Sequence, residues 1–173
     1  MRLFIAINLN NATKDSLVDL RDDLKSLSER GNFTFRENLH ITLAFLGECD
    51  AKQAAAAKAA MDSLSLRPFD VRIERIGRFM AGQGEATWWA GVSVGETLSA
   101  LNLELADRLE AAGFLIDKRK FSPHITLGRR VVTDAVPRRV GPFVETVKKI
   151  DLMKSERIDG KLTYTAIHHA NAF

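Results

Sequence analysis

Short apolar runs alternate along the chain with leucines at helical spacing. Residues 3–8 and 87–94 are rich in β-branched and aromatic side chains, a composition typical of strands. Two further segments place leucine at every third or fourth position, the period of one face of an amphipathic helix. These leucines are Leu17, Leu20, Leu24 and Leu27 in the first segment and Leu98, Leu101, Leu105 and Leu109 in the second. Each helix is therefore expected directly after a strand.

Polar and glycine residues mark the ends of both expected helices. The turn at residues 10–13 offers asparagine and threonine as N-caps, and residues 95–97 form the matching turn before the second helix. Gly31 and Gly113 follow the last leucines and are interpreted as C-terminal caps. After each glycine, a loop leads to a strand that contains the sequence His-Ile-Thr-Leu.

The two halves of the chain repeat each other at a nearly constant offset. The leucines at positions 17, 20 and 24 recur 81 residues later, and His40 recurs 84 residues later as His124. We therefore expect a strand–helix–strand unit that occurs twice. Related by pseudo-symmetry, the two units would place antiparallel sheets on either side of a central cleft.

The remaining segments complete an α+β, bilobal fold. The alanine-rich residues 50–66 predict a helix, and residues 69–79, 144–153 and 162–169 predict strands, the last two around an Asp-Gly turn. The turn Gly82-Gln83-Gly84 is expected to separate the lobes. The chain is thus interpreted as one domain of two intertwined lobes, with approximate halves 1–83 and 84–173.

The repeated motif places two polar side chains on one face of each strand. Residues i and i+2 of a strand point the same way, so His40 and Thr42 share one face while Ile41 and Leu43 share the other. His124 repeats this arrangement with Thr126. The next positions on the polar faces are Ala44 and Gly128, whose small size leaves room for a substrate.

Two such strands facing each other would surround one phosphodiester with two imidazoles and two hydroxyls. A neutral imidazole accepts a proton from water, and a protonated one donates a proton to the leaving oxygen, because the pKa of histidine lies near neutrality. The threonine hydroxyls can bind the non-bridging oxygens and hold the phosphorus for in-line attack. The pattern therefore predicts general acid–base catalysis by His40 and His124.

Other chemistry has weaker support. One His-x-Thr sequence on a strand indicates little, but two copies in matching contexts favour catalysis over packing. Neither motif has a carboxylate or third histidine at ligand spacing, so no metal site and no cofactor are expected. His168 and His169 are interpreted as structural or surface residues on alternate faces of a strand, and the single cysteine, Cys49, as unreactive.

Composition and charge fit a cytoplasmic globular protein that binds an anion. Hydrophobic residues make up 46% of the chain and charged residues 27%, which argues against disorder, and no apolar run is long enough to span a bilayer. The N-terminus lacks the features of a signal peptide. The formal net charge is +3, but residues 114–149 hold nine basic residues against three acidic ones. Such a segment suits a polyanionic ligand, and equally a solvated basic face.

These motifs resemble the 2H phosphoesterase superfamily, and within it the LigT-like RNA 2′,3′-cyclic phosphodiesterases. The matching stretches are residues 2–7, 37–48, 119–129 and 152–155, with Tyr164. The resemblance implies a bilobal fold with a central cleft and metal-independent opening of RNA 2′,3′-cyclic phosphate ends to a 2′-phosphate. The implied substrates are RNA ends or cyclic nucleotides. No membrane association and no obligate protein partner are implied.

The resemblance also assigns roles to residues. His40 would be the proton donor, His124 the proton acceptor, and Thr42 and Thr126 the phosphate ligands. A family arginine five residues after the second histidine corresponds to Arg129. Strand parity instead favours Arg130, and a bulge at Gly128 would reconcile the two. Family members often carry Trp or Val where this chain has Phe33-Thr34-Phe35; an aromatic side chain there, Phe33 or Phe35, either stacks on a base or packs in the core.

Two other functions remain open at this point. RNA 2′–5′ ligation would use the same residues in the reverse direction. A non-catalytic RNA-end-binding protein would depend on the basic segment more than on the histidines.

Overall fold

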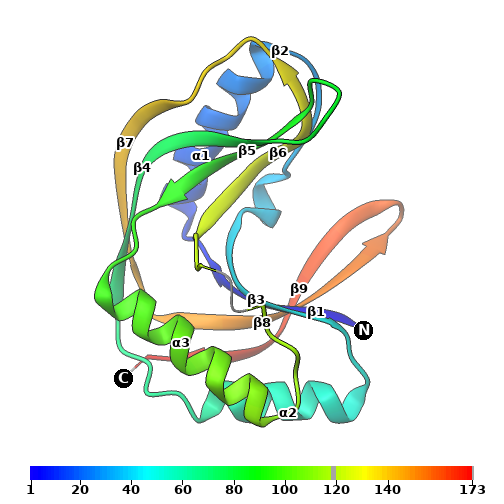
Figure 1. Cartoon of the computed structure of the whole chain (residues 1–173), viewed down its shortest axis with the longest axis vertical. Helices are drawn as coiled ribbons and strands as arrows, with labels where there is room; N and C mark the ends of the chain where they lie inside the picture. Colours follow the sequence, from blue (N-terminus) through cyan, green and yellow to red (C-terminus); the bar gives the residue numbers. More distant parts are fainter. Residues whose placement is uncertain (118–119, 173) are drawn as a thin grey trace.

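The computed structural model describes residues 1–117 and 120–172. Across these residues the strands form two antiparallel sheets (Figure 1). Sheet A has the order β3-β1-β8-β9, and its strands are β1 (Arg2–Asn8), β3 (His40–Glu48), β8 (Lys149–Ile158) and β9 (Lys161–Asn171). Sheet B has the order β2-β6-β5-β4-β7, and its strands are β2 (Ser28–Phe33), β4 (Phe69–Met80), β5 (Ala86–Val92), β6 (His124–Thr133) and β7 (Arg138–Val147).

Helices α1 and α3 each follow a strand of one sheet and pack on the other sheet. Helix α1 (Asn11–Ser26) follows β1 of sheet A, leads into β2 of sheet B, and contacts β2, β6 and β7 of sheet B. Helix α3 (Glu96–Ala111) joins β5 to the segment before β6 but lies against α2 (Ala51–Asp62) and hydrogen-bonds β3 of sheet A through Asn102. This exchange of helices gives the predicted repeat its three-dimensional form.

Local sequence explains where two of the helices begin. The side chain of Asn10 accepts a hydrogen bond from the Thr13 amide at 2.8 Å, which confirms the expected N-cap of α1. At α2, the Asp50 carboxylate accepts from the Gln53 amide, and the Gln53 side chain accepts from the Asp50 amide, a complete capping box.

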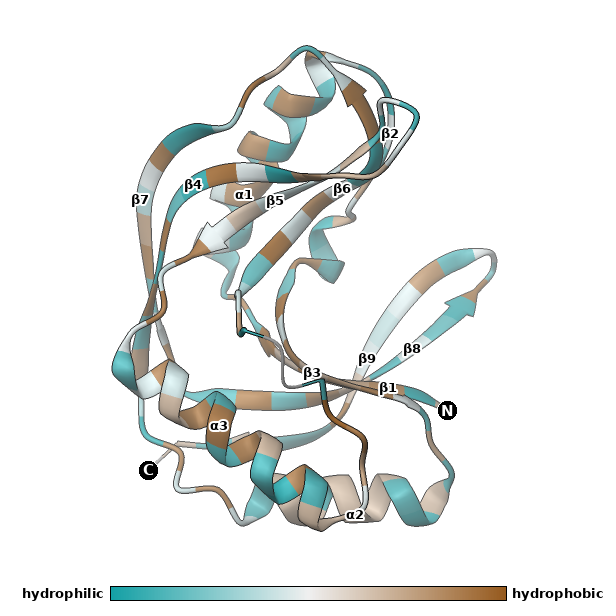
Figure 2. Ribbon diagram, in the orientation of Figure 1, coloured by the Kyte–Doolittle hydropathy of each residue, from teal (hydrophilic) through white to brown (hydrophobic). Residues whose placement is uncertain are grey.

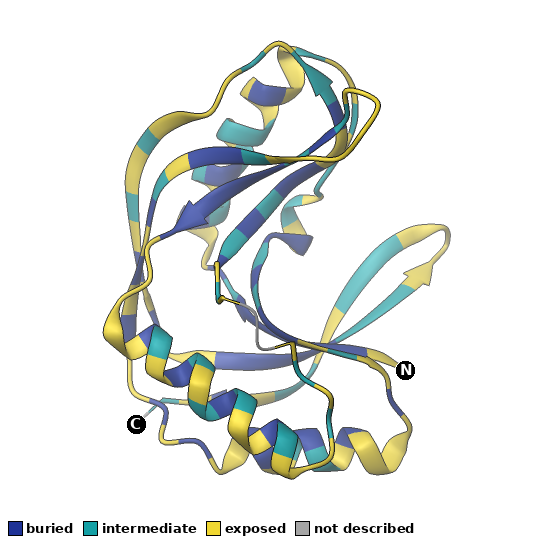
Figure 3. Ribbon diagram, in the orientation of Figure 1, coloured by how far each residue is buried: buried dark blue, intermediate teal, exposed yellow. Residues whose placement is uncertain are grey.

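The core lies between each sheet and its helices. Hydrophobic side chains from one face of sheet A, including Ile5 and Ile41, and from one face of sheet B, including Trp88 and Ile125, join α1, α2 and α3 in one buried cluster. Strand β5 is buried along most of its length (Figure 3), and the helices alternate hydrophobic with hydrophilic positions (Figure 2). We call this helix-covered side of each sheet its outer face, and the opposite side, which carries the His-x-Thr side chains, its inner face.

Two expected boundaries are wrong. The turn at residues 82–84 does not separate lobes, because it joins β4 to β5, which pair in register within sheet B. Residues 144–153 do not form one strand, because β7 ends at Val147 in sheet B and β8 begins at Lys149 in sheet A. The apolar pattern runs through this point without a turn signal, so no local feature of the sequence indicates the change of sheet.

Gly31 is also not a helix cap. Helix α1 ends at Ser26, and Leu27 takes the C-cap position. Gly31 lies inside β2, a strand at the edge of sheet B, where a Cβ atom would lie 2.9 Å from a methyl carbon of Val131. The polar sequence Ser-Glu-Arg-Gly-Asn-Phe of β2 carries no period-two apolar pattern, which is why it was not predicted as a strand.

The expected fold class, an α+β fold of two facing antiparallel sheets, is confirmed. The Asp159-Gly160 turn is also as predicted, with positive φ at both residues between β8 and β9. Among the described residues, no helix is long and apolar enough to cross a membrane.

Gly77 of β4 is a position where a single methyl group should destabilise the fold. A Cβ atom there would lie 2.4 Å from Cη2 of Trp89, whose ring is largely buried. We expect Gly77→Ala to lower the free energy of unfolding by about 1–3 kcal/mol through overpacking. Gly95→Ala, whose Cβ would meet nothing within 4 Å, is the control and should cost less. Urea unfolding measures both; equal losses would contradict the packing argument.

Candidate active site

The imidazole of His40 is held by hydrogen bonds on both ring nitrogens. Its Nδ1 lies 2.7 Å from the carbonyl oxygen of Asn38, and its Nε2 lies 2.9 Å from the hydroxyl of Thr42. A carbonyl oxygen only accepts, so Nδ1 carries a proton. In the neutral ring, Nε2 is then the basic nitrogen and accepts from the Thr42 hydroxyl.

The imidazole of His124 is anchored in the same way. Its Nδ1 lies 2.9 Å from the carbonyl oxygen of Ser122, again two residues earlier in the chain. Both histidines therefore carry a proton on Nδ1 and present Nε2 as the nitrogen available for proton transfer. The repeat seen in sequence extends to the hydrogen bond that fixes each tautomer.

Aromatic rings flank both imidazoles. His40 lies 5.1 Å from the ring of Phe4 and 5.3 Å, edge to face, from the ring of Tyr164. His124 lies 5.5 Å, edge to face, from Phe79 and 6.4 Å from Trp89. Each histidine is thus flanked by rings from other strands of its own sheet, which limits the rotation of the imidazole.

The two motifs come together between the sheets. Strand β3 contacts β6. Burial lowers the pKa of His40 below its usual value, and the Asn38 hydrogen bond raises it. Electrostatic interactions with Arg129, His124 and Lys14 lower the pKa of His40 further. The charge of Arg129 also acts on Tyr164, whose pKa is raised chiefly by burial. Arg129, His124 and Lys14 are therefore all electrostatic neighbours of His40.

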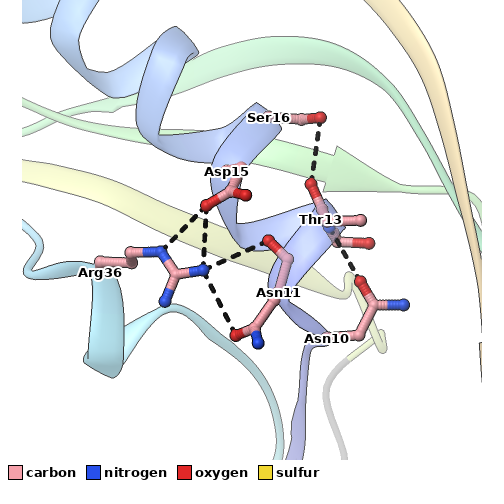
Figure 4. A network of polar contacts seen from close by, with 7 residues as sticks. Asn10, Asn11, Thr13, Asp15, Ser16 and Arg36 are labelled. Carbon is pink, nitrogen blue, oxygen red and sulfur yellow. Dashed lines mark hydrogen bonds and ion pairs between the residues drawn. The ribbon is translucent and has the colours of Figure 1, made fainter.

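The segment before His40 is fixed at both ends. Asn38, which is buried, donates from its side-chain amide to the Leu162 carbonyl of β9 at 2.9 Å. In the short 3-10 helix η1 (Arg36–Asn38), the Arg36 guanidinium donates to the Asp15 carboxylate and to Asn11 at the start of α1 (Figure 4). Asn38 thus sets the position of the carbonyl that orients His40.

The backbone of β6 and the electrostatics of His40 favour Arg129 over Arg130 as the arginine near the motif. The pairing of β5 with β6 shifts register between Trp88 and Trp89, opposite residues 126–128, where the sequence argument requires a bulge. A second irregularity follows at Arg130, which adopts a positive φ of 52°. The charge of Arg129 is among the influences that lower the pKa of His40.

The two phenylalanines before the first motif have different surroundings. Phe33 is partly buried against the core, and a Cβ atom at Gly128 would lie 3.1 Å from its ring, so Phe33 supports β6 from β2. Phe35 remains 46% exposed, with the ammonium of Lys161 lying 4.3 Å from its ring centroid. Of the two, only Phe35 offers a face to a ligand.

The remaining histidines lie on β9, three strands from β3 in sheet A, with His169 in the row of paired residues that leads through Asp151 and Ala6 to Thr42. His168 contacts Asp62 of α2 on the outer face of sheet A, at 2.7 Å. His169 contacts the buried carboxylate of Asp151, which also accepts from Asn8 at 2.6 Å. Within the described residues, no group of three or more His, Cys, Asp or Glu side chains could hold a metal ion, and Cys49 is buried. Lys118 and Arg119 of the basic segment lie outside the described residues.

Several neighbours of the histidines, Asn38, Trp89 and Phe79 among them, were not singled out from the sequence as parts of the site. Asn38 precedes the first motif by two positions and appeared only within a matching stretch. Trp89 and Phe79 lie beside His124 because of strand pairings that no local pattern reveals. The sequence predicted Trp89 and Phe79 only as residues of strands, not as neighbours of His124.

Comparison with known proteins gives one family. A sequence model described as the 2′-5′ RNA ligase superfamily matches residues 13–166. The RNA 2′,3′-cyclic phosphodiesterase of Archaeoglobus fulgidus is 30% identical over 129 residues, covering 75% of this chain and 72% of the relative. That of Geobacillus stearothermophilus is 31% identical over 136 residues, covering 73% of this chain but only 41% of the relative.

Solved structures share the fold over nearly the whole chain. LigT of Escherichia coli, crystallised with 3′-AMP, superimposes with a TM-score of 0.84 and covers 99% of this chain and 97% of that one, at 23% sequence identity. At that identity the similarity concerns the fold, and it extends to both sheets.

The lowered pKa of His40 predicts how stability depends on pH. The unfolded chain takes up this proton near the ordinary pKa of 6.5, above the pKa of the folded chain. The stability contributed by neutral His40 is therefore complete above the unfolded pKa of 6.5, and it is lost as the pH falls through the lower pKa of the folded chain. We expect His40→Gln to flatten the free energy of unfolding between about pH 7 and pH 5, measured by urea unfolding.

Lys52→Gln, on the exposed surface of α2, is the control and should keep the parental slope. An unchanged slope in His40→Gln would mean that His40 does not titrate differently in the folded chain.

Proposed function

Because the chain belongs to the 2′-5′ RNA ligase superfamily, whose sequence model spans residues 13–166, we propose that it hydrolyses 2′,3′-cyclic phosphates at RNA ends to 2′-phosphates. The observation that carries this proposal is the matched pair of imidazoles, each anchored through Nδ1 to the carbonyl two residues earlier. The printed activity of the relatives, RNA 2′,3′-cyclic phosphodiesterase, supports the choice of substrate.

In the proposed reaction, each imidazole uses its Nε2. The Nε2 of His124 accepts a proton from water while the water oxygen forms a bond to phosphorus. The bond between phosphorus and O3′ breaks, and the protonated Nε2 of His40 gives its proton to O3′. The product carries a phosphate on O2′, and the histidines have exchanged protonation states, which solvent restores.

Thr42, Thr126 and Arg129 are proposed to bind the non-bridging oxygens. The Thr42 hydroxyl, 2.9 Å from His40 Nε2, can turn its proton to a phosphate oxygen once that nitrogen is protonated. Thr126 occupies the equivalent position two residues after His124. The guanidinium of Arg129 supplies positive charge where charge develops on the phosphorane oxygens.

The acid role of His40 requires that substrate binding change its protonation. In the free protein, burial and nearby positive charge favour the neutral ring. A bound phosphate would bring a negative charge against the imidazole and raise its pKa. His40 is thus proposed to take up its proton together with the substrate, so that the acid is charged only when a phosphate is present.

The family description also favours a second reaction. Ligation of a cyclic phosphate end to a 5′-hydroxyl replaces water by the hydroxyl as nucleophile, with the same two imidazoles transferring the protons. A 5′-hydroxyl oligonucleotide added to the assay distinguishes the reactions, because ligation yields a longer product with a 2′–5′ bond.

Removing either imidazole should abolish most turnover of a 2′,3′-cyclic phosphate. We expect His40→Ala and His124→Ala each to lower kcat by about 10²-fold or more, since each deletes one proton transfer. Thr42→Ala and Thr126→Ala each remove one hydrogen bond and should cost about tenfold. Chromatography of products, with and without chelator, measures rate and position of the phosphate.

The matched control is His168→Ala, which deletes an imidazole bound to Asp62 on the outer face of sheet A and should keep parental activity. We expect a 2′-phosphate product and undiminished turnover in chelator. Near-parental turnover in either motif variant would contradict the two-imidazole mechanism, and a 3′-phosphate product would reverse the assignment of the acid. Binding of RNA ends without turnover in the parental protein would indicate a binding protein.

A further inference from the structure

A straight row of residues crosses the inner face of sheet B from His124 outward. His124 of β6 pairs with Gly91 of β5, Gly91 pairs with Arg75 of β4, and Arg75 pairs with Arg139 of β7. Directly paired residues on antiparallel strands project to the same side of a sheet. Both arginines therefore share the face that carries the His124 imidazole.

The second position of this row is open because it is a glycine. A Cβ atom at Gly91 would lie 3.0 Å from Nε and 3.1 Å from Cγ of Arg75. The side chain of Arg75 uses this space and places its guanidinium 5.0 Å from the ring centroid of Trp89. Trp89 in turn pairs with Thr126 of the second motif, so the guanidinium leans along the sheet toward the motif.

A pocket of about 440 Å³ covers this row beside His124. Its lining includes Arg75, Arg139 and Lys120, and also Ser122 and Pro123, the two residues that precede His124. The volume lies within the range of small-ligand sites, about 300–1,000 Å³. The pocket is thus continuous in sequence and in strand pairing with the proposed site of proton transfer.

The charge of the pocket is positive. Among the described lining residues one is acidic, Glu74, which already pairs with Arg72 at 2.8 Å and accepts from the Ser93 hydroxyl at 3.2 Å. No carboxylate of the described residues forms an ion pair with Arg75, Arg139 or Lys120. Three cations without a protein counterion, gathered at one pocket, favour an anionic ligand.

We propose that this pocket binds the 5′-phosphate of the terminal nucleotide, the group that in an RNA substrate links the cyclic end to the rest of the chain. This inference rests on the proposed function and specifies its substrate. The cyclic phosphate lies at His124, and Arg75 and Arg139 hold the next phosphate of the same strand. The site thereby selects polynucleotide ends over cyclic nucleosides.

Strand spacing supports this placement. Neighbouring strands lie about 4.8 Å apart, so the backbone of Arg75 is about 10 Å from that of His124 along the row. The Arg75 side chain extends toward Trp89, so its guanidinium lies closer to His124 than the Arg75 backbone does. A phosphate bound to this guanidinium is therefore within reach of a cyclic phosphate at His124. Arg139 lies one strand further out along the same row.

Three substrates with the same base separate the contribution of the 5′-phosphate to kcat/KM from that of the next nucleotide of the RNA. The first is a nucleoside 2′,3′-cyclic phosphate without a 5′-phosphate, the second is its 5′-phosphorylated form, and the third is a dinucleotide with the same cyclic end. We expect kcat/KM to be about tenfold higher for the second and third than for the first, because only these carry the charged group that the arginines bind.

In Arg75→Gln and Arg139→Gln, the ratio of kcat/KM for the dinucleotide to that for the cyclic nucleoside should fall about tenfold. The salt dependence of log kcat/KM for the dinucleotide should also lose about 0.7 of its slope per arginine removed. Arg67→Gln, which removes an exposed arginine from the loop between α2 and β4, is the matched control and should keep the parental ratio.

Three results would overturn the inference. One is that the parental protein has nearly equal kcat/KM for the dinucleotide and for the cyclic nucleoside, and that the variants keep this ratio. Another is a gain with the dinucleotide that the 5′-phosphorylated nucleotide does not share, which would mean that a base is read instead. The third is an equal loss with all substrates in Arg75→Gln and Arg139→Gln, which would make these arginines supports for Trp89 and His124 only.

Failure of the proposed function would be seen separately. If the parental protein turned over none of the three substrates, the inference would be decided by fluorescence anisotropy with a labelled dinucleotide that ends in a 2′-phosphate. Weaker binding by Arg75→Gln and Arg139→Gln than by Arg67→Gln would support the pocket, and equal binding by all three would refute it.

Discussion

The hydrogen bond from each histidine Nδ1 to the carbonyl two residues earlier is the interaction on which the site depends. It fixes the tautomer, so Nε2 of both His40 and His124 faces the space between the sheets. The carbonyl in turn depends on the chain before each motif. At His40 it is held by the buried Asn38, whose side chain is bonded to β9, and at His124 it belongs to the segment that borders the positive pocket.

Helices α1 and α3 each pack on the sheet opposite to the strand that they follow, and this arrangement keeps the two histidine–carbonyl hydrogen bonds in one folding unit. Helix α1 leaves sheet A to cover sheet B, α3 leaves sheet B to cover sheet A, and the chain changes sheets again between β7 and β8. The buried residues on the outer faces of both sheets consequently join the helices in one cluster. Moving one sheet away from the helices that cover it would expose hydrophobic side chains of both lobes to water. This shared core favours a fixed distance between the two imidazoles.

The sequence predicted the parts of this arrangement that are local. Period-two and helical patterns located most strands and helices, and strand parity correctly placed His40 beside Thr42. Long-range pairing could not be predicted, because nothing near Gly91 in the chain indicates that it separates His124 from Arg75. The polar edge strand β2 and the change of sheet at Lys148 were missed for the same reason, since tertiary pairing rather than local pattern defines them.

In the proposed mechanism two Nδ1-protonated imidazoles act on one phosphate, and binding of that phosphate protonates His40. ¹⁵N NMR of histidine-labelled protein at neutral pH, free and saturated with a nucleotide 2′-phosphate, observes both protonation states. We expect the Nδ1–H tautomer at both motif histidines in the free protein, and a second proton on His40 Nε2 when the nucleotide is bound. An Nε2–H tautomer at either residue, or a His40 ring that stays neutral in the complex, would contradict it.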